Sequence, residues 1–567
     1  MSLLDLASLV LAPTATKEGK VYSAIPDTGD GDMTFTRGSS ATRINSAGLI
    51  EKERGNLLLQ SNTFDTTWVN GNSNVSSGFE GYDGSNDAWK IDLTGSGGHL
   101  RQNVSYSGVN TFSIYLKAGS LGFARLLLFA SPNNQVDLNL TTGATSLGSG
   151  IVANSEDVGG GWFRFSITGN LTSATRVYIY PAQAIGDFTA TSGNIYIQDA
   201  MLNEGLVATD YIPTTTSAVY EGITDDVPRV DYSGGGCPAL KLEPQRSNLI
   251  TQSEYFNGSN WNNFSGITPI TNSLISPEGV QNGSTLECSG NAVFRYSFTA
   301  TASTDYVGSI FVKAKGTTND FGIQTLESGT AYTSVFDIEN GSVISEGANH
   351  TASIEDYGNG WYRCVVQFNS GTSTSNIFDL KGSQTSTKKD FYAYGAMLEA
   401  GSYSTSYIPT YGVSSTRVAD SCSKTGISDV IGQTEGTLFL DVDTTNFEGD
   451  QRFGISDGTS ANRIVLRLSG SLIQLSVVIG NTTQASITGS GSSGNRYKIA
   501  GVYKENDFAL YINGSLAATD TSGIVSGTFS RLATDRGFSG QDFYNPIKQA
   551  ILFPTRLTND QLSELTK

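Results

Sequence analysis

The chain has 567 residues, and its 53 acidic against 35 basic side chains give a formal net charge of -18. This length exceeds a single hydrophobic core and predicts three or four domains. The acidic balance argues against nucleic-acid binding, which needs a basic surface, and no stretch approaches the roughly 20 apolar residues that a membrane-inserted helix requires. The abundance of Gly, Ser, Thr, Asn and Tyr is typical of short strands joined by tight turns.

Residues 1–55 are predicted to form a mostly extended N-terminal arm. The apolar run from Leu3 to Leu11 contains Asp5 and has no preceding Lys or Arg, so it is not predicted to be a secretory signal. An apolar set in so short an arm buries poorly and is typical of an interface, which predicts that the arm docks the chain on a partner. The alternative is a strand or helix that completes the first sandwich. The apolar residues are Leu3, Leu4, Leu6, Leu9, Val10 and Leu11.

Residues 56–217 and 248–414 are predicted to be two copies of one domain, joined by a Gly- and Pro-rich linker at 218–247. The segment from Ala200 to Pro213 returns from Ala396 to Pro409 with eight of fourteen positions identical. Strand patterns such as Trp162–Thr168 alternate apolar and polar residues, and turn residues separate them at short intervals. Each copy is therefore predicted to be an antiparallel β-sandwich. Further matched segments are Asn56–Phe64 with Asn248–Phe256, Phe112–Gly119 with Gly308–Lys315, and Glu156–Arg164 with Glu355–Arg363.

Similar arginine-containing connectors precede each domain. They contain Thr42-Arg-Ile-Asn45, Pro228-Arg-Val-Asp231 and Ser415-Thr-Arg-Val-Ala-Asp420. We expect these arginines to form an inter-domain clasp by pairing with neighbouring carboxylates. Binding of a partner is the alternative.

Residues 415–567 change character and predict a jelly roll. Phe508–Leu516 is an alternating hairpin whose Asn513-Gly514 suits a type I′ turn. Thr558 and Gln561 have the spacing of a capping box for one short terminal helix.

Two acidic pairs, Glu156-Asp157 and Glu355-Asp356, occupy matching places in the two copies. Glycosidases use two carboxylates, but adjacent strand residues point to opposite faces and cannot easily flank one bond. We therefore expect turns that the aspartates stabilise by bonding the backbone. No cofactor is predicted. Calcium binding is the third option for these acidic residues, because oxygen-rich loops abound, but no dense Asp-x-Asp run supports it.

Trp89 is the candidate ligand-binding residue. The other tryptophans form duplicated pairs, which is expected of core positions, whereas Trp89 has no counterpart in the second copy. An unmatched, exposed indole would suit stacking on a sugar ring, with a core position as the equal alternative. The duplicated pairs are Trp68 with Trp261 and Trp162 with Trp361.

His99 and His350 lie far from any nucleophile pattern, so the sequence predicts no acyl-transfer triad and no histidine-based zinc site. The four cysteines have neither metal spacing nor duplicated counterparts, so reduced, partly buried thiols are expected. No catalytic residue is assigned.

The C-terminal region resembles the laminin-G/concanavalin A-like jelly-roll family. The resemblance rests on the strand ending in Tyr511-Ile-Asn-Gly514, a late strand at Ile547–Phe553 and the final Leu557-Thr-Asn-Asp-Gln-Leu562 helix. Members of this family commonly bind glycans or proteins, and many are inert structural modules.

The duplicated half resembles carbohydrate-binding-module-like sandwiches of tailed-bacteriophage virion proteins. The strings that carry this are Ser40–Glu51, the Asn-Leu…Gln-Ser…Phe…Trp segments of both copies, and Ser421–Ile427 leading into Gly432–Leu438. The resemblance implies a non-enzymatic tail or head fibre or appendage on the virion, assembled in the host cytoplasm. It implies contacts to other virion proteins through the arm, host surface glycan as ligand, and a homo-oligomer, with a trimer suggested although no heptad repeat supports it. A glycan depolymerase and an inert capsid decoration protein stay open as alternatives.

Overall fold

The computed structural model describes residues 2–316, 320–382, 390–538 and 540–567. Strands take up 56% of the structure and helices 3%, which confirms the predicted all-β fold. The helices within the described ranges are all too short or too polar to cross a bilayer. The chain forms two compact units, one from residues 53–222 and 247–415 and the other from 1–52, 223–246 and 416–567.

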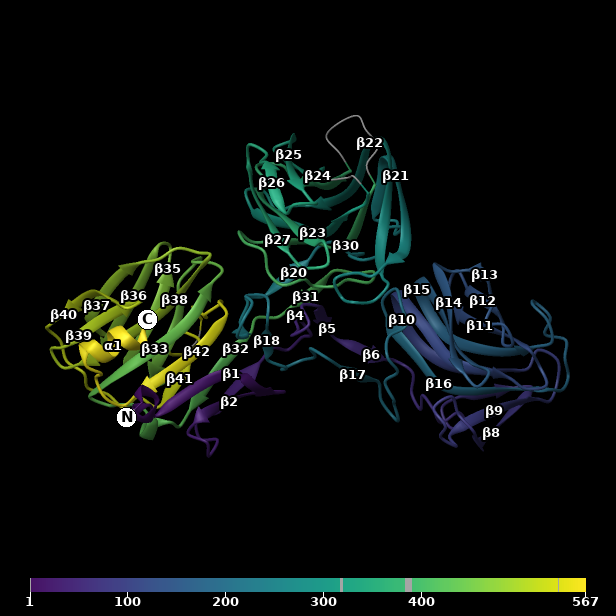
Figure 1. Cartoon of the computed structure of the whole chain (residues 1–567), viewed down its shortest axis with the longest axis horizontal. Helices are drawn as coiled ribbons and strands as arrows, with labels where there is room; N and C mark the ends of the chain where they lie inside the picture. The colour runs from purple at the N-terminus through teal and green to yellow at the C-terminus, as the bar shows by residue number, and fades with distance from the viewer. Residues whose placement is uncertain (1, 317–319, 383–389, 539) are drawn as a thin grey trace. The chain divides into compact units, whose positions relative to one another are not determined.

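The first copy is an antiparallel sandwich with the strand order β13-β12-β11-β15-β10-β16-β9-β8. Two long strands, β10 and β15, run through both of its layers (Figure 1). The first half of β15 pairs with β14 and its second half pairs with β11. The strands are β7 (Val69–Gly71), β8 (Ser73–Phe79), β9 (Ala88–Leu93), β10 (His99–Ala118), β11 (Phe123–Phe129), β12 (Asn134–Asn139), β13 (Thr145–Ser149), β14 (Val152–Gly159), β15 (Trp162–Ala182) and β16 (Asn194–Glu204).

The second copy repeats this plan with the order β26-β25-β24-β29-β22-β30-β23-β28-β27. Here two separate strands, β28 and β29, take the place of β15, because a turn that includes Gly371 at a φ of 60° interrupts the segment. The strands are β21 (Trp261–Leu274), β22 (Gly283–Thr299), β23 (Asp305–Ala314), β24 (Asp320–Glu327), β25 (Thr330–Asp337), β26 (Ser342–Ser345), β27 (His350–Asp356), β28 (Trp361–Asn369), β29 (Ser375–Lys381) and β30 (Phe391–Ala400).

A buried asparagine explains the most strongly repeated motifs. In the first copy the amide of Asn56 donates to the carbonyls of Ala200 and Ile212, at 3.1 and 2.8 Å. In the second copy Asn248 donates to Ala396 and Ile408 at the same two distances. Because buried carbonyls need donors, this clip fixes the entry strand to the Ala-Met-Leu…Ile-Pro segment in both domains.

The remaining unit contains the predicted jelly roll, and its largest sheet has the order β37-β36-β35-β34-β41-β32-β3-β2-β1-β42-β33-β38-β39-β40. Its strands are β1 (Leu9–Lys17), β2 (Lys20–Ile25), β3 (Met33–Thr36), β18 (Arg229–Asp231), β19 (Ala239–Lys241), β32 (Ser421–Thr425), β33 (Glu435–Thr444), β34 (Gln451–Ser456), β35 (Arg463–Ser469), β36 (Leu472–Ile479), β37 (Thr482–Ser490), β38 (Asn495–Lys504), β39 (Phe508–Ile512), β40 (Ser515–Asp520), β41 (Arg531–Ala533) and β42 (Ile547–Phe553).

Short elements complete the chain. The strands pair as β4–β5, β6–β17 and β20–β31. They are β4 (Thr42–Ile44), β5 (Ile50–Lys52), β6 (Arg54–Asn56), β17 (Val219–Glu221), β20 (Arg246–Asn248) and β31 (Ser415–Arg417), and the helices are η1 (Leu3–Leu6), η2 (Ser428–Val430) and α1 (Asn559–Leu565).

The prediction of an extended N-terminal arm is wrong. Strand β1 pairs with β42, with Leu9 opposite Leu552, and the two strands lie side by side in Figure 1. Leu9 and Leu11 are buried in the same core as Leu438, and Val10 packs on the other side of the sheet. The alternative, completion of the first sandwich, is also wrong, because the segment completes the C-terminal unit. The argument for docking from unburied apolar residues therefore fails for Leu9, Val10 and Leu11.

Both local predictions for the C-terminal region are confirmed. Asn513 and Gly514 have φ angles of 46° and 80°, as a type I′ turn requires, and they join β39 to β40. The Thr558 hydroxyl accepts from the Gln561 N–H, and the Gln561 side chain accepts from the Thr558 N–H, which completes the capping box of α1.

Candidate functional site

Trp89 is not an exposed aromatic residue. Its side chain is 8% exposed, it packs against Phe64 with ring centroids 6.0 Å apart, and its indole N–H donates to the Asn62 carbonyl. The indole therefore offers no open face to a sugar ring. The four duplicated tryptophans are all buried, as predicted.

The acidic pairs lie at turns, as predicted. Asp157 accepts from the Gly159 N–H at 2.9 Å, and Asp356 accepts from the Gly358 N–H at 2.7 Å. Glu355 lies across the strand pair from Arg363. The two aspartates therefore stabilise turns of the backbone. They are not placed as a pair of carboxylates on either side of a glycosidic bond.

A group of carboxylates surrounds Gln198 in the first copy. Its amide donates to Asp83 and Asp87, and Asp199 lies next to it, where the Tyr82 hydroxyl donates to its carboxylate at 3.0 Å. Burial raises the pKa of Asp199 to about 6. Within the described ranges no group of three or more His, Cys, Asp or Glu side chains has the geometry to hold a metal ion, so the calcium option gains no site.

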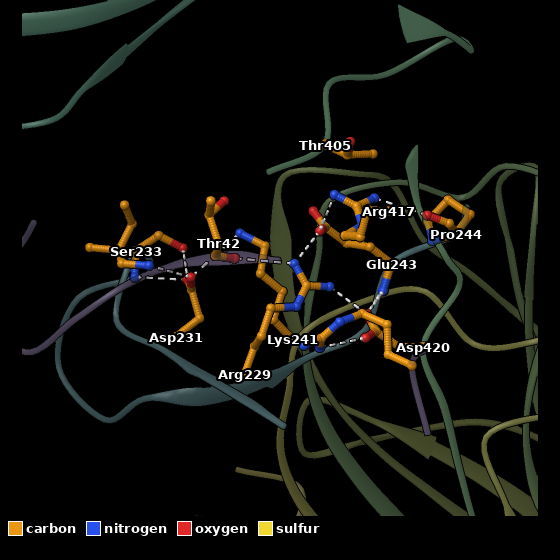
Figure 2. A network of polar contacts seen from close by, with 12 residues as sticks. Thr42, Arg229, Asp231, Ser233, Lys241, Glu243, Pro244, Thr405, Arg417 and Asp420 are labelled. Carbon is orange, nitrogen blue, oxygen red and sulfur yellow. Dashed lines mark hydrogen bonds and ion pairs between the residues drawn. The ribbon is translucent and has the colours of Figure 1, made fainter. Parts of the chain in front are cut away.

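Two connector arginines, Arg229 and Arg417, form a buried ion-pair network (Figure 2). The predicted pairing with carboxylates is confirmed for them, but the network lies within one unit and is not an inter-domain clasp. Arg229 binds both Glu243, at 2.5 Å, and Asp420, while Arg417 binds Glu243 at 3.0 Å. Arg37, which lies outside the repeated connectors, binds Asp420 at 3.3 Å. These residues come from all three segments of the jelly-roll unit, so the network fastens the segments together.

Arg43 departs from this pattern, because it pairs locally with Glu51 at 2.9 Å and is partly exposed. The four cysteines are free thiols, and all but Cys237 are buried. Burial raises the pKa of the Cys364 thiol well above its ordinary value.

The outer surface of the first sandwich carries an unexpected cluster of aromatic side chains. On β15, Val177 and Ile179 point into the core, so Tyr178 and Tyr180 point to the opposite face. We call this cluster the aromatic face; its members are His99, Phe129, Tyr178, Tyr180 and Phe188.

The rings of the aromatic face contact one another closely. Tyr178 and Tyr180 stack with centroids 5.4 Å apart, and His99 lies 5.2 and 5.0 Å from them. Tyr178 is only 7% exposed and forms the floor, whereas Phe129 is 37% exposed and the other rings are half-buried. The result is a solvent-facing apolar surface built mainly on strands of the sheet, with Phe188 added from the loop between β15 and β16.

Polar groups border these rings. The guanidinium of Arg125 lies 4.5 Å from the Phe188 centroid and that of Arg176 lies 5.5 Å from the Phe129 centroid. Arg101 is the strand partner of Tyr178. Burial and the neighbouring Tyr178 raise the pKa of Tyr180, so its hydroxyl is a neutral donor and acceptor at pH 7.

Among its described residues the second copy has no such face. The strand registers place Asp379 and Lys381 where the first copy has Tyr178 and Tyr180. Arg295 matches Arg101, the strand partner of Tyr178, and binds Asp379 through two hydrogen bonds of 2.8 and 2.7 Å. Two copies of one fold thus share their core and differ on this surface.

The sequence contained a signal for this face. The segment Arg176-Val-Tyr-Ile-Tyr180 has the alternation of a strand, which places its arginine and both tyrosines on one side. Only tryptophans were weighed as sugar-stacking residues, so the tyrosines were missed. His99 and Phe188 join them through pairing that no local pattern shows.

No family model and no curated protein sequence matches the chain. Solved structures with similar folds include the carbohydrate-binding module CBM40 of a Ruminococcus gnavus sialidase, at 15% identity over 25% of this chain and 90% of that one, with a TM-score of 0.23. The tandem CBM22 domains of Paenibacillus barcinonensis Xyn10C are 11% identical over 61% and 98%, with a TM-score of 0.19. Laminin α1 domains LG4-5 from mouse are 10% identical over 46% and 86%, with a TM-score of 0.17. At such TM-scores the likenesses carry no inference about a ligand.

Proposed function

We propose that the chain is a glycan-binding protein and that the aromatic face of the first sandwich is its binding surface. The observation that carries the proposal is the difference between the copies: rings occupy this surface in one, and the Arg295–Asp379 ion pair occupies it in the other. Aromatic side chains bordered by a few hydrogen-bonding groups are typical of ligand sites. Tyrosine supplies an apolar ring and a polar hydroxyl together, which suits a sugar.

A glycan array on the full chain tests this function. We expect the wild type to bind and Tyr180→Ala to bind at least about tenfold more weakly, since a lost ring contact and hydrogen bond together exceed 1.4 kcal/mol. Phe264→Ala is the matched control, because Phe264 is an aromatic residue 61% exposed on the second copy. Equal losses for both variants would contradict the assignment of the site.

We propose further that this binding serves attachment of a tailed-bacteriophage virion to host surface glycans. The support is the resemblance of both entry motifs and of Ser40–Glu51 to virion surface proteins. Attachment through an N-terminal arm is not carried forward, because β1 lies inside the core of the C-terminal unit. Immunogold labelling of intact particles should decorate the tail or head surface, and labelling confined to lysed host debris would contradict the virion role.

We propose that the chain acts without catalysis. The support is that Asp157 and Asp356 bind turn backbones rather than facing a partner carboxylate. Incubation with host surface polysaccharide should release no reducing ends. Release of oligosaccharides would favour a depolymerase instead, and a blank glycan array together with a blank whole-cell pull-down would favour an inert decoration protein.

A further inference from the structure

The aromatic face concentrates positive charge in a strongly acidic chain. Arg101, Arg125 and Arg176 all border its rings, and Asp137 is paired with Arg125 alone. The whole chain carries a formal charge of -18, so a group of three arginines with a single paired carboxylate is opposite in sign to the net charge.

The three arginines are engaged differently. Arg125 binds both carboxylate oxygens of Asp137, at 2.6 and 2.9 Å, and is thereby neutralised. Arg101 donates to the side-chain oxygen of Asn103 at 2.8 Å, and Arg176 donates to the Tyr178 hydroxyl at 3.3 Å. Both of these acceptors are uncharged. Within the described ranges neither Arg101 nor Arg176 has a carboxylate partner.

Arginines on other sheet surfaces of this chain commonly have such a partner. Arg496 binds Asp441 and Arg531 binds Asp535, each pair through two nitrogen–oxygen contacts. With acidic residues in excess, pairing is the expected state of a surface arginine. Arg101 and Arg176 both lie beside Tyr178 and contact only neutral acceptors. Their positive charges are therefore available to an anionic group of a ligand.

We infer that the glycan bound by the aromatic face is acidic, and that Arg101 and Arg176 bind carboxylate groups on its sugar rings. This inference rests on the proposed function. A guanidinium offers parallel N–H groups that match the two oxygens of a carboxylate. The rings supply contact with the sugar, and the two guanidinium groups select a sugar that carries a negative charge.

Paired polysaccharides that differ only in their carboxylates test the inference. Polygalacturonate, alginate and unsulfated chondroitin are each compared with their carboxyl-reduced forms, with the full chain as the binder. We expect at least one acidic form to bind, its reduced form to bind at least about tenfold more weakly, and affinity to fall as salt rises, because charge-assisted hydrogen bonds contribute on this scale.

Charge-removing variants locate the effect. Arg101→Gln and Arg176→Gln should each weaken binding of the acidic form about tenfold and leave binding of the reduced form unchanged. Arg496→Gln, which makes the same charge change on the other unit, is the matched control and should bind as the wild type does.

The outcomes separate this inference from the proposed function. Equal binding of acidic and reduced forms, or binding of neutral or sulfated glycans alone, overturns the carboxylate inference and leaves glycan binding in place. Binding of no glycan at all overturns both. Loss of binding with Arg496→Gln equal to that with Arg101→Gln also overturns the inference, since the effect would then follow the overall charge.

Discussion

Asp199 stands at a backbone position that the second copy fills with glycine. Its φ is 52°, and that of the matching Gly395 is 59°, so both domains need the left-handed conformation at this bulge in the strand. Only glycine adopts it without strain. An aspartate whose carboxylate is also buried therefore lowers the stability of the first sandwich in two ways.

The pH dependence of Asp199 follows from its pKa of about 6, which burial raises from the ordinary 3.8. The folded state holds a proton that the unfolded state releases, so the stabilisation is complete at low pH and is lost as pH rises through about 4 to 6. We expect Asp199→Asn to raise the free energy of unfolding by on the order of 1–3 kcal/mol at pH 7.5 and by much less near pH 4.

Tryptophan fluorescence measures this change selectively, since all five tryptophans lie in the unit of the two sandwiches. Denaturant titrations at the two pH values give the difference. The same gain at both pH values would contradict the pKa argument, because relief of backbone strain does not depend on pH.

His350 responds to pH in the opposite direction. It is buried between the hydroxyls of Thr325 and Ser334, and burial lowers its pKa from 6.5 to about 4. The folded state therefore favours the neutral ring, and stability present above pH 6.5 is lost as pH falls toward 4. His350→Gln should flatten the acid side of the stability profile of the sandwich unit, whereas an unchanged profile would contradict this assignment.

Side-chain environments could be predicted from the sequence where duplication carried the information. The shared tryptophans and the turn aspartates were identified correctly for that reason. Trp89 was misjudged because its absence from the second copy was weighed as a sign of exposure. In the second copy Phe294 stacks on Trp261, with centroids 5.1 Å apart. The core of each copy therefore contains an additional aromatic residue, which comes from β9 in the first copy and from β22 in the second.

At the scale of elements, β1 shows where sequence patterns stop being informative. The local pattern showed an apolar run, but the strand that pairs with β1 is β42, more than five hundred residues later in the chain. The hydrogen bond from the Ser8 hydroxyl to the Leu552 carbonyl spans this separation. The hairpin at Asn513 and the helix at Thr558 were predicted correctly because their signals are local. Pairing between distant strands leaves no such trace in a single sequence.

Deletion of residues 2–30 tests the position of β1. We expect the C-terminal unit to unfold or aggregate, because Leu9 and Leu11 leave its core and β42 becomes an open edge. Circular dichroism should show lost strand signal while the tryptophan transition of the other unit persists. Deletion of residues 2–5 alone, which spares β1, is the control, and a soluble chain with an unchanged thermal profile after the longer deletion would contradict the fold.

At the scale of the whole molecule, two units are each assembled from separate stretches of chain. The buried network of Arg229, Arg417, Glu243 and Asp420 joins the stretches of the jelly-roll unit. The sequence predicted its arginines from the repeated connectors, but it could not assign their partners.

Asp420→Asn tests that network. It leaves Arg37 and Arg229 buried with one charge fewer to balance them, and breaking a buried pair lowers stability by about 3–5 kcal/mol. Asp443→Asn is the control, because its pair with Lys548 is partly exposed and contributes about 1 kcal/mol at most. Calorimetry of the jelly-roll unit should separate the two variants, and equal small losses would contradict this role of the network.

The central claim is that one copy of a duplicated sandwich binds glycan through its aromatic face and the other does not. The most direct measurement is a binding titration of a surface exchange between the copies. Tyr178→Asp with Tyr180→Lys gives the first copy the side chains that the second copy carries at Asp379 and Lys381, so that Arg101 gains the ion pair that Arg295 already makes. We predict that this variant keeps its tryptophan unfolding transition and binds glycan at least about a hundredfold more weakly, while Asp379→Tyr with Lys381→Tyr keeps full affinity. Undiminished binding by the first variant, with its fold intact, would contradict the account.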